Sequence, residues 1–369
     1  MLQPPIEPML AKPLGNDVPE GLAGMAAEPK WDGFRCLVFR DEHGVVLQGR
    51  GRSRSGGDDY IDLAYAFPEV VAACTDALPP GSVIDAELVI PIDGRLDFGT
   101  LTSRLRPRSE AGGTNIARLA DETPATLLAF DLLWSSGDLM AEPLSSRREA
   151  LTALSTSWQP PLLVTPQTRA EAIARDWFDR FESAGVDGLI LKPLDDPYAP
   201  GQRAQFKIKH RRTADVVVAG WRPHAKPGAD GHDVVGSLLL GLHDEGGRLQ
   251  YIGVASAFTA AKRAELVRLL APYEVDAEAP HPWRDAGQGR VPGEVNRWNA
   301  ARRAGEPAWH ALRPELVAEV TYDQMEGDRL RHVAGFARWR PDREAASCDY
   351  DQLEVPPASS ISALLPLGG

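Results

Sequence analysis

A chain of 369 residues is too long for one ordinary domain and suits two or three. Hydrophobic residues make up 43% and charged residues 25%, so substantial cores can form, and no apolar run approaches the roughly 20 residues that cross a bilayer. The formal net charge of −12 argues mildly against a nucleic-acid partner, but phosphate contacts need only a local basic track. These features disfavour a chain that crosses a membrane, and we expect no membrane partner.

The cysteines and the first residues favour a cytoplasmic location. Cys36, Cys74 and Cys348 form no CxxC pair, which suits a reducing cytoplasm and offers no zinc-finger spacing. The opening segment MLQPPIEPMLAKPLG lacks a basic stretch followed by an apolar one, so it does not resemble a secretory signal. The histidines are scattered along the chain and predict no transition-metal site.

The first two hundred residues alternate between strand and helix patterns. Apolar positions alternate within residues 26–51 on both sides of a turn at Asp41–Gly44, which predicts a hairpin. Further strands are predicted at residues 82–90, 125–134 and 187–193. Helices are predicted at residues 147–155 and 169–185, the second closed by Gly185. The pattern predicts a mixed α/β layer.

The pattern changes near residue 212. Strands with Gly-rich turns are predicted at residues 214–221, 237–255 and 315–324, and one helix at residues 259–275. Five short strands with one helix fit a small closed barrel of the OB type. The preceding segment QFKIKHRRTA is basic and contains no acid, which favours a boundary there. We therefore predict domains at residues 1–212 and 213–354, followed by a loose Pro/Ser-rich tail at residues 355–369.

Lys30-Trp31-Asp32-Gly33 is the first candidate for chemistry. Alone it is a weak motif, and a solvated Lys before a turn is the alternative interpretation. A Gly turn beside the lysine would let the backbone approach a nucleotide closely. Further short motifs follow in order along the chain: Ser53-Arg54-Ser55-Gly56, Asp85-Ala86-Glu87-Leu88, Phe130-Asp131-Leu132-Leu133, Asp187-Gly188-Leu189-Ile190-Leu191-Lys192, Lys207-Ile208-Lys209 and Arg338-Trp339-Arg340-Pro341-Asp342-Arg343.

This ordered set resembles the covalent nucleotidyltransferase superfamily, which comprises ATP-dependent DNA ligases, RNA ligases and mRNA capping enzymes. The resemblance runs from about residue 5 to residue 343. Residues 289–299 and 313–332 look like the OB domain of small bacterial accessory DNA ligases, the actinobacterial type in particular. The resemblance implies an α+β (mixed α/β) nucleotidyltransferase domain, ATP-grasp-like, that is followed by an all-β OB-fold barrel.

The function that this resemblance implies is ATP-dependent DNA ligation in the bacterial cytosol, with a role in DNA repair. The expected cofactors are ATP, as the donor of AMP, and Mg²⁺ or Mn²⁺. The expected partner is nicked duplex DNA, and the protein is expected to act as a monomer. By this resemblance, Lys30 would take AMP from ATP. The AMP would then pass to the 5′-phosphate of a nick, and the 3′-hydroxyl would displace it.

The resemblance also implies a role for each matched residue. Lys30 would form the lysyl-AMP bond, and Lys207 and Lys209 would grip the α-phosphate. The other nucleotide contacts would lie around the base, the ribose and the phosphates: Glu28 at the purine edge, Phe130 stacked on adenine, Asp32 and Glu87 at the ribose, Arg35 and Arg54 facing phosphate, Lys192 as a further cation, and Arg340, Asp342 and Arg343 near the pyrophosphate. The metal carboxylates would be Asp187 and Glu87.

Elementary chemistry explains why such residues are needed. A lysine amine attacks the α-phosphorus only when it is deprotonated, and neighbouring cations lower its pKa. The candidate cations are a bound Mg²⁺ and the strand lysines Lys192, Lys207 and Lys209. The same positive charges would stabilise the phosphate in the transition state.

Several of these residues have a structural alternative. Phe130 lies in an apolar run and fits a core position equally well. Asp85 and Glu87 alternate with apolar residues, so one of them would face solvent; we favour Glu87 as the functional residue. Lys207 and Lys209 share one face of a strand, as a solvent-exposed edge would also produce.

The chain departs from the family at two positions. Asp187 stands where Glu is usual, which shortens the presumed metal ligand by one methylene. Arg343 stands where the closing motif usually has Lys, so the charge is kept but its geometry changes.

Two alternative functions remain. An RNA ligase or a capping guanylyltransferase belongs to the same superfamily. A catalytically inert OB protein that binds nucleic acid would have no need for Lys30, Glu87, Lys207 and Lys209 together. An NAD-dependent ligase is disfavoured by the missing cysteine cluster and the short chain.

Overall fold

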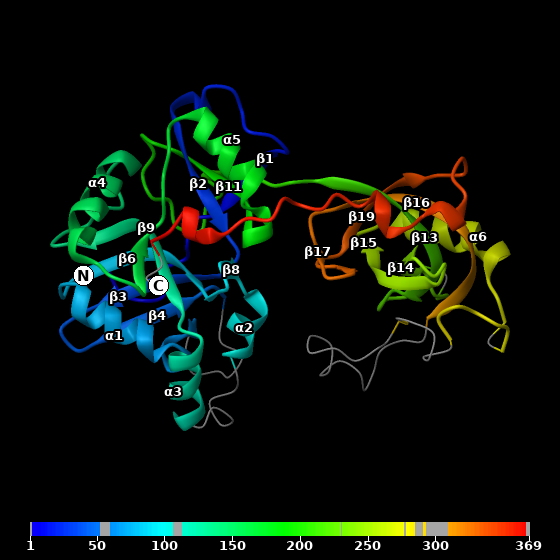
Figure 1. The fold of residues 1–369 in the computed structure, drawn as a ribbon, viewed down its shortest axis with the longest axis horizontal. Helices are drawn as coiled ribbons and strands as arrows, with labels where there is room; N and C mark the ends of the chain where they lie inside the picture. Colours follow the sequence, from blue (N-terminus) through cyan, green and yellow to red (C-terminus); the bar gives the residue numbers. More distant parts are fainter. Residues whose placement is uncertain are drawn as a thin grey trace. The chain divides into compact units, whose positions relative to one another are not determined.

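The chain forms two compact units in the computed structural model (Figure 1). Residues 2–51, 60–105, 113–229, 231–276, 278–284, 291–292 and 309–366 are described. The first unit comprises Met1–His210 together with Pro356–Gly369, and the second comprises Arg211–Val355. The second unit is therefore inserted into the sequence of the first.

Two sheets form the centre of the first unit. The larger sheet runs in the order β10 (Leu162–Val164), β9 (Thr126–Ser135), β6 (Ser82–Val89), β3 (Phe34–Arg40), β4 (Val45–Gly49) and β5 (Ile61–Asp62). The smaller sheet runs in the order β1 (Ala11–Gly15), β12 (Gln205–Ile208), β11 (Val186–Pro193) and β2 (Met25–Trp31). A short hairpin pairs β7 (Pro91–Ile92) with β8 (Arg95–Leu96).

Four of the five described helices of this unit, α1, α2, α4 and α5, contribute apolar residues to the cores of these sheets. The helices are α1 (Pro68–Ala77), α2 (Phe98–Ser103), α3 (Gly113–Glu122), α4 (Leu144–Leu154) and α5 (Glu171–Arg180). Val70 of α1 and Leu151 of α4 join the core of the larger sheet, and Phe178 of α5 packs with Leu189 and Leu191 of the smaller one. None of the described helices combines the length and apolarity that a membrane crossing requires.

The predicted elements of this unit are confirmed. The hairpin β3–β4 turns at Asp41–Gly44, where the Asp41 carboxylate accepts hydrogen bonds from the backbone of His43 and Gly44. The strands predicted at residues 82–90, 125–134 and 187–193 are β6, β9 and β11. The second predicted helix ends at Arg180, and a 3-10 turn leads to Gly185 with φ of +95°. Helices α1, α2 and α3 were not predicted.

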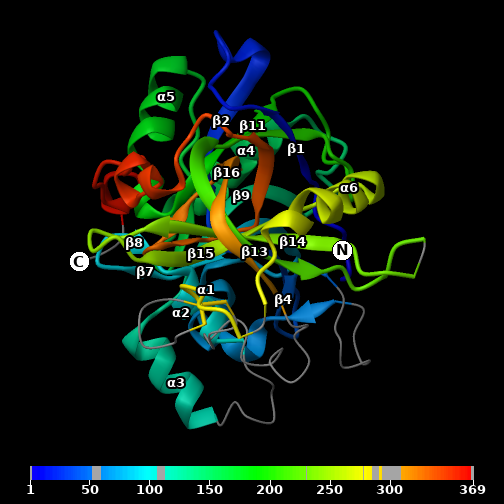
Figure 2. The ribbon, with the colours of Figure 1, turned by 90° about the vertical axis from the view of Figure 1, so that its right-hand side faces the viewer.

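The second unit is a closed barrel, as the OB prediction required. Its strands are β13 (Arg212–Pro223), β14 (Val235–His243), β15 (Leu249–Ser256), β19 (Ala334–Trp339) and β16 (His310–Tyr322). Figure 2 shows these strands with α6 (Ala260–Leu270) beside them. The Thr259 side chain caps α6 by accepting from the Lys262 amide, and Leu266 and Leu270 enter the barrel core. A short hairpin pairs β17 (Met325–Glu326) with β18 (Arg329–Leu330).

The C-terminal segment is not a loose tail, so that prediction was wrong for residues 356–366. The segment returns to the first unit (Figure 1). Ile361 and Leu365 are buried in a cluster with Trp31 and Phe181, and the Ile361 amide donates to the Gly94 carbonyl at 2.8 Å. The spacing of Ile361 and Leu365 places both on one face of a helical turn, and burial of that face outweighs the loop-like Pro and Ser content.

Candidate active site

Three lysines gather around one carboxylate where β2, β11 and β12 lie side by side. Lys30 Nζ lies 2.7 Å from Asp187 Oδ2, and Lys209 Nζ lies 2.6 Å from the same oxygen. Lys30 and Lys209 outweigh the effect of burial and lower the pKa of Asp187. Partial burial, with the charges of Lys209 and Lys30, lowers the pKa of Lys207. The arrangement concentrates positive charge at the end of β2.

Two glycines, Gly33 and Gly188, allow the backbone beside Lys30 and Asp187 to pass close to a neighbouring strand. A Cβ on Gly33 would lie 2.3 Å from the Leu88 carbonyl oxygen, so the turn after Lys30 can pass β6 only with Gly. Gly188 has φ of +107°, and a Cβ there would lie 2.0 Å from the Ile208 carbonyl oxygen. Both glycines of the predicted motifs therefore have a local steric cause, and the pairing of β2 with β11 brings Lys30 near Asp187.

Lys30 lines a pocket of about 540 Å³ in the first unit. The pocket collects residues from β2, β3, β6, β9, β11 and β12. The predicted site residues that line it are Glu28, Lys30, Asp32, Arg35, Glu87, Phe130, Lys192 and Lys207. Residues that lie more than one hundred positions apart in the sequence thus meet in one cavity of nucleotide size.

The Phe130 ring faces two cations rather than a purely apolar core. Arg35 Cζ lies 4.4 Å and Lys192 Nζ 4.3 Å from the ring centroid, which is cation–π distance. Arg35 is fixed by Asp85, with Nη2 at 2.6 Å from Oδ2, and Tyr198 also donates to this carboxylate. Asp85 is fully buried, so it is not the solvated member of the pair, and Glu87 is half-buried where it lines the pocket. The ion pair with Arg35 stabilises the buried charge of Asp85.

Glu28 is a buried acid that lines the pocket, with 2% of its surface exposed. It precedes Lys30 by two residues, so both side chains lie on one face of β2. Lys192 Nζ lies 2.6 Å from its Oε2. Gln167 Nε2 donates to Oε1 at 2.8 Å, and Arg148 Nη1 approaches the same oxygen at 3.4 Å.

Glu87 and Asp187 are the carboxylates predicted to hold a metal. Burial raises the pKa of Glu87 to about 7, against the opposing effect of Arg35 and Lys30. Both lysine contacts of Asp187 are made to Oδ2, which leaves Oδ1 as the oxygen that a cation could use. The described residues contain no group of three or more His, Cys, Asp or Glu side chains placed for a metal ion. The donor set fits a hard cation that takes its other ligands from nucleotide phosphates.

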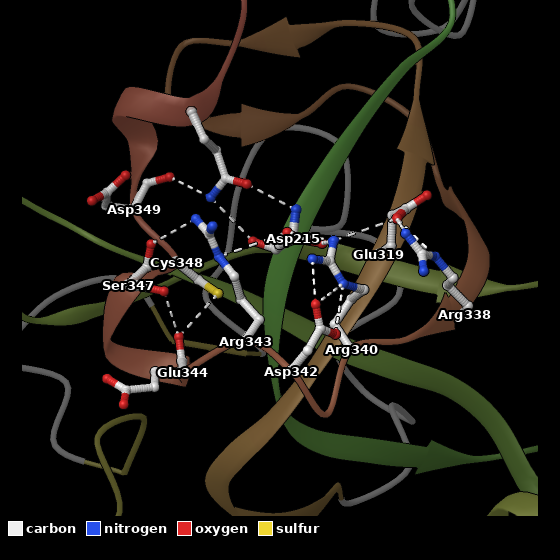
Figure 3. A network of polar contacts seen from close by, with 11 residues as sticks. Asp215, Glu319, Arg338, Arg340, Asp342, Arg343, Glu344, Ser347, Cys348 and Asp349 are labelled. Carbon is white, nitrogen blue, oxygen red and sulfur yellow. Dashed lines mark hydrogen bonds and ion pairs between the residues drawn. The ribbon is translucent and has the colours of Figure 1, made fainter.

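Arg340, Asp342 and Arg343 lie together in the second unit. Figure 3 shows the Arg340 guanidinium directed at Asp342 and at Asp215 of β13. Arg340 Nη1 lies 2.9 Å from both Asp215 oxygens, and Arg343 Nε lies 3.7 Å from Asp215 Oδ2. The hydrogen bond from Arg340 lowers the pKa of Asp342 to about 2. Asp215 thus contacts two of the three arginines of the closing motif, Arg340 and Arg343.

Some predicted positions cannot be placed, and some contacts had no sequence signal. Arg54 and most of residues 289–299 lie outside the described residues. Gln167 and Arg148, which contact Glu28, belong to no motif. They come close to Glu28 only through the fold. Asp215 is likewise a single acid at the start of a strand. Arg203, which also lines the pocket, lies four residues before Lys207 and could have been found from that proximity.

Comparisons with known proteins agree along most of the chain. The family model described as ATP dependent DNA ligase domain matches residues 8–209, and the model described as ATP dependent DNA ligase C terminal region matches residues 231–343. DNA ligase C2 of Mycolicibacterium smegmatis is 45% identical over 365 residues, covering 97% of this chain and 96% of that protein. DNA ligase C of Mycobacterium tuberculosis is 43% identical over 376 residues, covering 99% and 98%.

A solved structure supports the fold alone. It is titled as a structure–function analysis of Lig E DNA ligases that bind DNA with a minimal scaffold. It aligns with a TM-score of 0.52 and 18% identity, over 90% of this chain and 99% of that chain.

Proposed function

Since the chain belongs to the ATP-dependent DNA ligases, we propose that Lys30 carries AMP from ATP to the 5′-phosphate of a nick in duplex DNA. One observation carries the assignment. Lys30 Nζ lies at a nucleotide-sized pocket, within a group of charges made by Asp187, Lys207 and Lys209. A lysine on the solvated surface would not lie within such a group of charges.

In the first step the Lys30 amine loses a proton and attacks the α-phosphorus of ATP. A nitrogen–phosphorus bond forms, the bond to the bridging oxygen breaks, and pyrophosphate leaves with the electron pair. Asp187 orients the amine through its contact at 2.7 Å. Lys207 and Lys209 stabilise the negative charge that develops on the α-phosphate.

In the second step an oxygen of the nick 5′-phosphate attacks the phosphorus of lysyl-AMP. The phosphorus–nitrogen bond breaks and Lys30 regains its proton, which leaves AMP on the DNA. In the third step the 3′-hydroxyl attacks the 5′-phosphorus and AMP departs. Lys207 and Lys209 serve the α-phosphate in the first two steps, since the charge to be stabilised is the same.

The remaining pocket residues bind the nucleoside. Phe130 stacks on adenine and Glu28 accepts from the purine edge, because both face the cavity that holds Lys30. Asp32 and Glu87 are assigned to the ribose. Arg35 and Lys192 supply positive charge beside the Phe130 ring. Arg340, Asp342 and Arg343 are assigned to the pyrophosphate of the first step.

A divalent cation, Mg²⁺ or Mn²⁺, would be held by Glu87 and by Oδ1 of Asp187. Bound there, it would neutralise negative charge on the phosphates of ATP. The Glu87 carboxylate, whose pKa is raised to about 7, is a suitable partner, because a neighbouring cation would favour its ionised form.

Labelled ATP tests the proposal directly. Lys30→Ala should abolish transfer of label to the protein, whereas Lys12→Ala, which changes an exposed lysine of β1 outside the pocket, should leave it intact. A circular dichroism spectrum and melting temperature like those of the wild type would show that the Lys30 variant is folded. Labelling of Lys30→Ala at the wild-type level would refute the assignment.

Labelled GTP and nicked duplexes test the substrate. The wild type should form protein-bound AMP in preference to protein-bound GMP, and should then seal a nick with DNA on both sides. Preference for GTP would instead indicate a capping enzyme. Preference for nicks with RNA on both sides would indicate an RNA ligase.

A further inference from the structure

The surroundings of Glu28 contain a second layer of polar groups that the proposed reaction does not use. Glu28 Oε1 accepts from Gln167 Nε2 at 2.8 Å and is approached by Arg148 Nη1 at 3.4 Å. Lys192 lies on the other oxygen, Oε2, at 2.6 Å. Three donors therefore surround a carboxylate that has about four acceptor positions.

The backbone holds both partners of Oε1 in place. The amides and carbonyls of Ala27 and Thr168 are paired in both directions, at 2.8 and 2.9 Å, so Gln167 is held beside β2. Arg148 lies on α4 and also donates through Nη2 to the Thr165 carbonyl. Gln167 and Arg148 thus reach Glu28 from two separately anchored segments.

This arrangement restricts what Glu28 can bind. An ionised carboxylate has no proton to donate and can only accept hydrogen bonds. Its remaining acceptor position suits an N–H group at the edge of a base. An oxygen in the same place would direct a lone pair at a negative charge and find no donor.

On this basis, and building on the proposed function of the pocket, we propose that Gln167 and Arg148 are positioning residues that make the site select a purine with a 6-amino group. They act through Glu28, since they fix the direction of Oε1. Without them the carboxyl group could rotate, and its remaining acceptor position would no longer point at the base. Selectivity for ATP over a 6-oxo nucleotide would then fall.

The experiment compares ATP with ITP, which differs in carrying oxygen in place of the 6-amino group. Initial rates of protein nucleotidylation are measured for the wild type, Gln167→Met and Arg148→Met. Gln167→Met keeps the length of the side chain but removes its donor. Gln159→Met, at an exposed position before β10, is the matched control.

The ratio of kcat/KM for ATP to that for ITP should fall roughly tenfold in Gln167→Met, as the loss of one hydrogen bond to a charged group implies. The change should lie mainly in KM for ATP, because Lys30 and its phosphate partners are untouched. Arg148→Met should lower the same ratio, and Gln159→Met should leave it unchanged.

Two results would count against the idea, and they differ from failure of the proposed function. If both variants lose activity with ATP and ITP by the same factor, Gln167 and Arg148 stabilise the pocket without selecting the base. If the variants behave like the wild type, the contacts are incidental. In either case the wild type would still form lysyl-AMP, whereas a wild type that forms none would refute the function itself.

Discussion

Replacing Asp187 with Asn removes one negative charge and keeps the shape of the side chain. In the structure this carboxylate is contacted by Lys30 at 2.7 Å and by Lys209 at 2.6 Å. Its side chain is 14% exposed and the lysines are 23% and 30% exposed, so solvent screens the contacts only in part. Asn would remove the negative charge that Lys30 and Lys209 contact and that lies near Lys207.

The size of the effect follows from those contacts. A hydrogen bond to a charged group is worth about 1.5–3 kcal/mol. If about 2 kcal/mol of that interaction aligns Lys30 for attack, formation of lysyl-AMP should slow roughly 30-fold. Asp187→Glu restores the charge and should retain substantial activity.

The assay is the initial rate of protein adenylylation over a range of Mg²⁺ concentrations. The reduction in Asp187→Asn should persist at saturating Mg²⁺, because misaligned lysines are not corrected by more metal. Asp176→Asn, which alters an exposed ion pair with Arg180 on α5, is the matched control. A variant that reaches the wild-type rate once Mg²⁺ is raised would refute this reasoning and show that Asp187 acts through the metal alone.

Three further predictions concern other parts of the molecule. Arg340→Ala or Asp342→Ala should slow self-adenylylation by at least about tenfold, while sealing of a nick that already carries the 5′-adenylate stays nearly unchanged; equal slowing of both reactions would contradict a role limited to pyrophosphate. Arg147→Ala should lower the free energy of unfolding in urea by about 3–5 kcal/mol, because it leaves the buried Asp131 without its partner at 2.7 Å; a loss under about 1 kcal/mol would contradict this. In the nucleotide-free protein Glu87 gains its charge as pH rises through about 7, so kcat/KM for adenylylation should rise over that range and the rise should disappear in Glu87→Gln.

The sequence predicted the parts of the site that are encoded locally. Lys30, Asp187 and Lys207 stand in short motifs on strands. The motifs of Lys30 and Asp187 also contain Gly33 and Gly188, where a side chain would clash with a neighbouring carbonyl oxygen. The strand pattern placed each of these motifs on or beside a predicted strand of a mixed α/β layer. Their meeting in one pocket needed only the correct pairing of β2, β11 and β12.

The second layer of the site was beyond the reach of sequence patterns. Glu28 meets Arg148 and Gln167 across separations of 120 and 139 residues, and single polar residues carry no periodic signal. Burial of Asp85 depends on Arg35 and Tyr198, so alternation alone suggested a solvated face. Helix α1 did carry a signal that was missed, since Pro68 stands at its first turn.

The return of the C-terminal segment bears on the order in which the protein folds during synthesis. A domain usually folds as a unit once its residues have left the ribosome. Here the buried hydrophobic cluster that contains Trp31, the residue after Lys30 on β2, is completed by Ile361 and Leu365. The whole barrel is therefore synthesised before the first unit can close its core. Strand β2, which carries Lys30, becomes fully supported only when residues 361–365 have emerged.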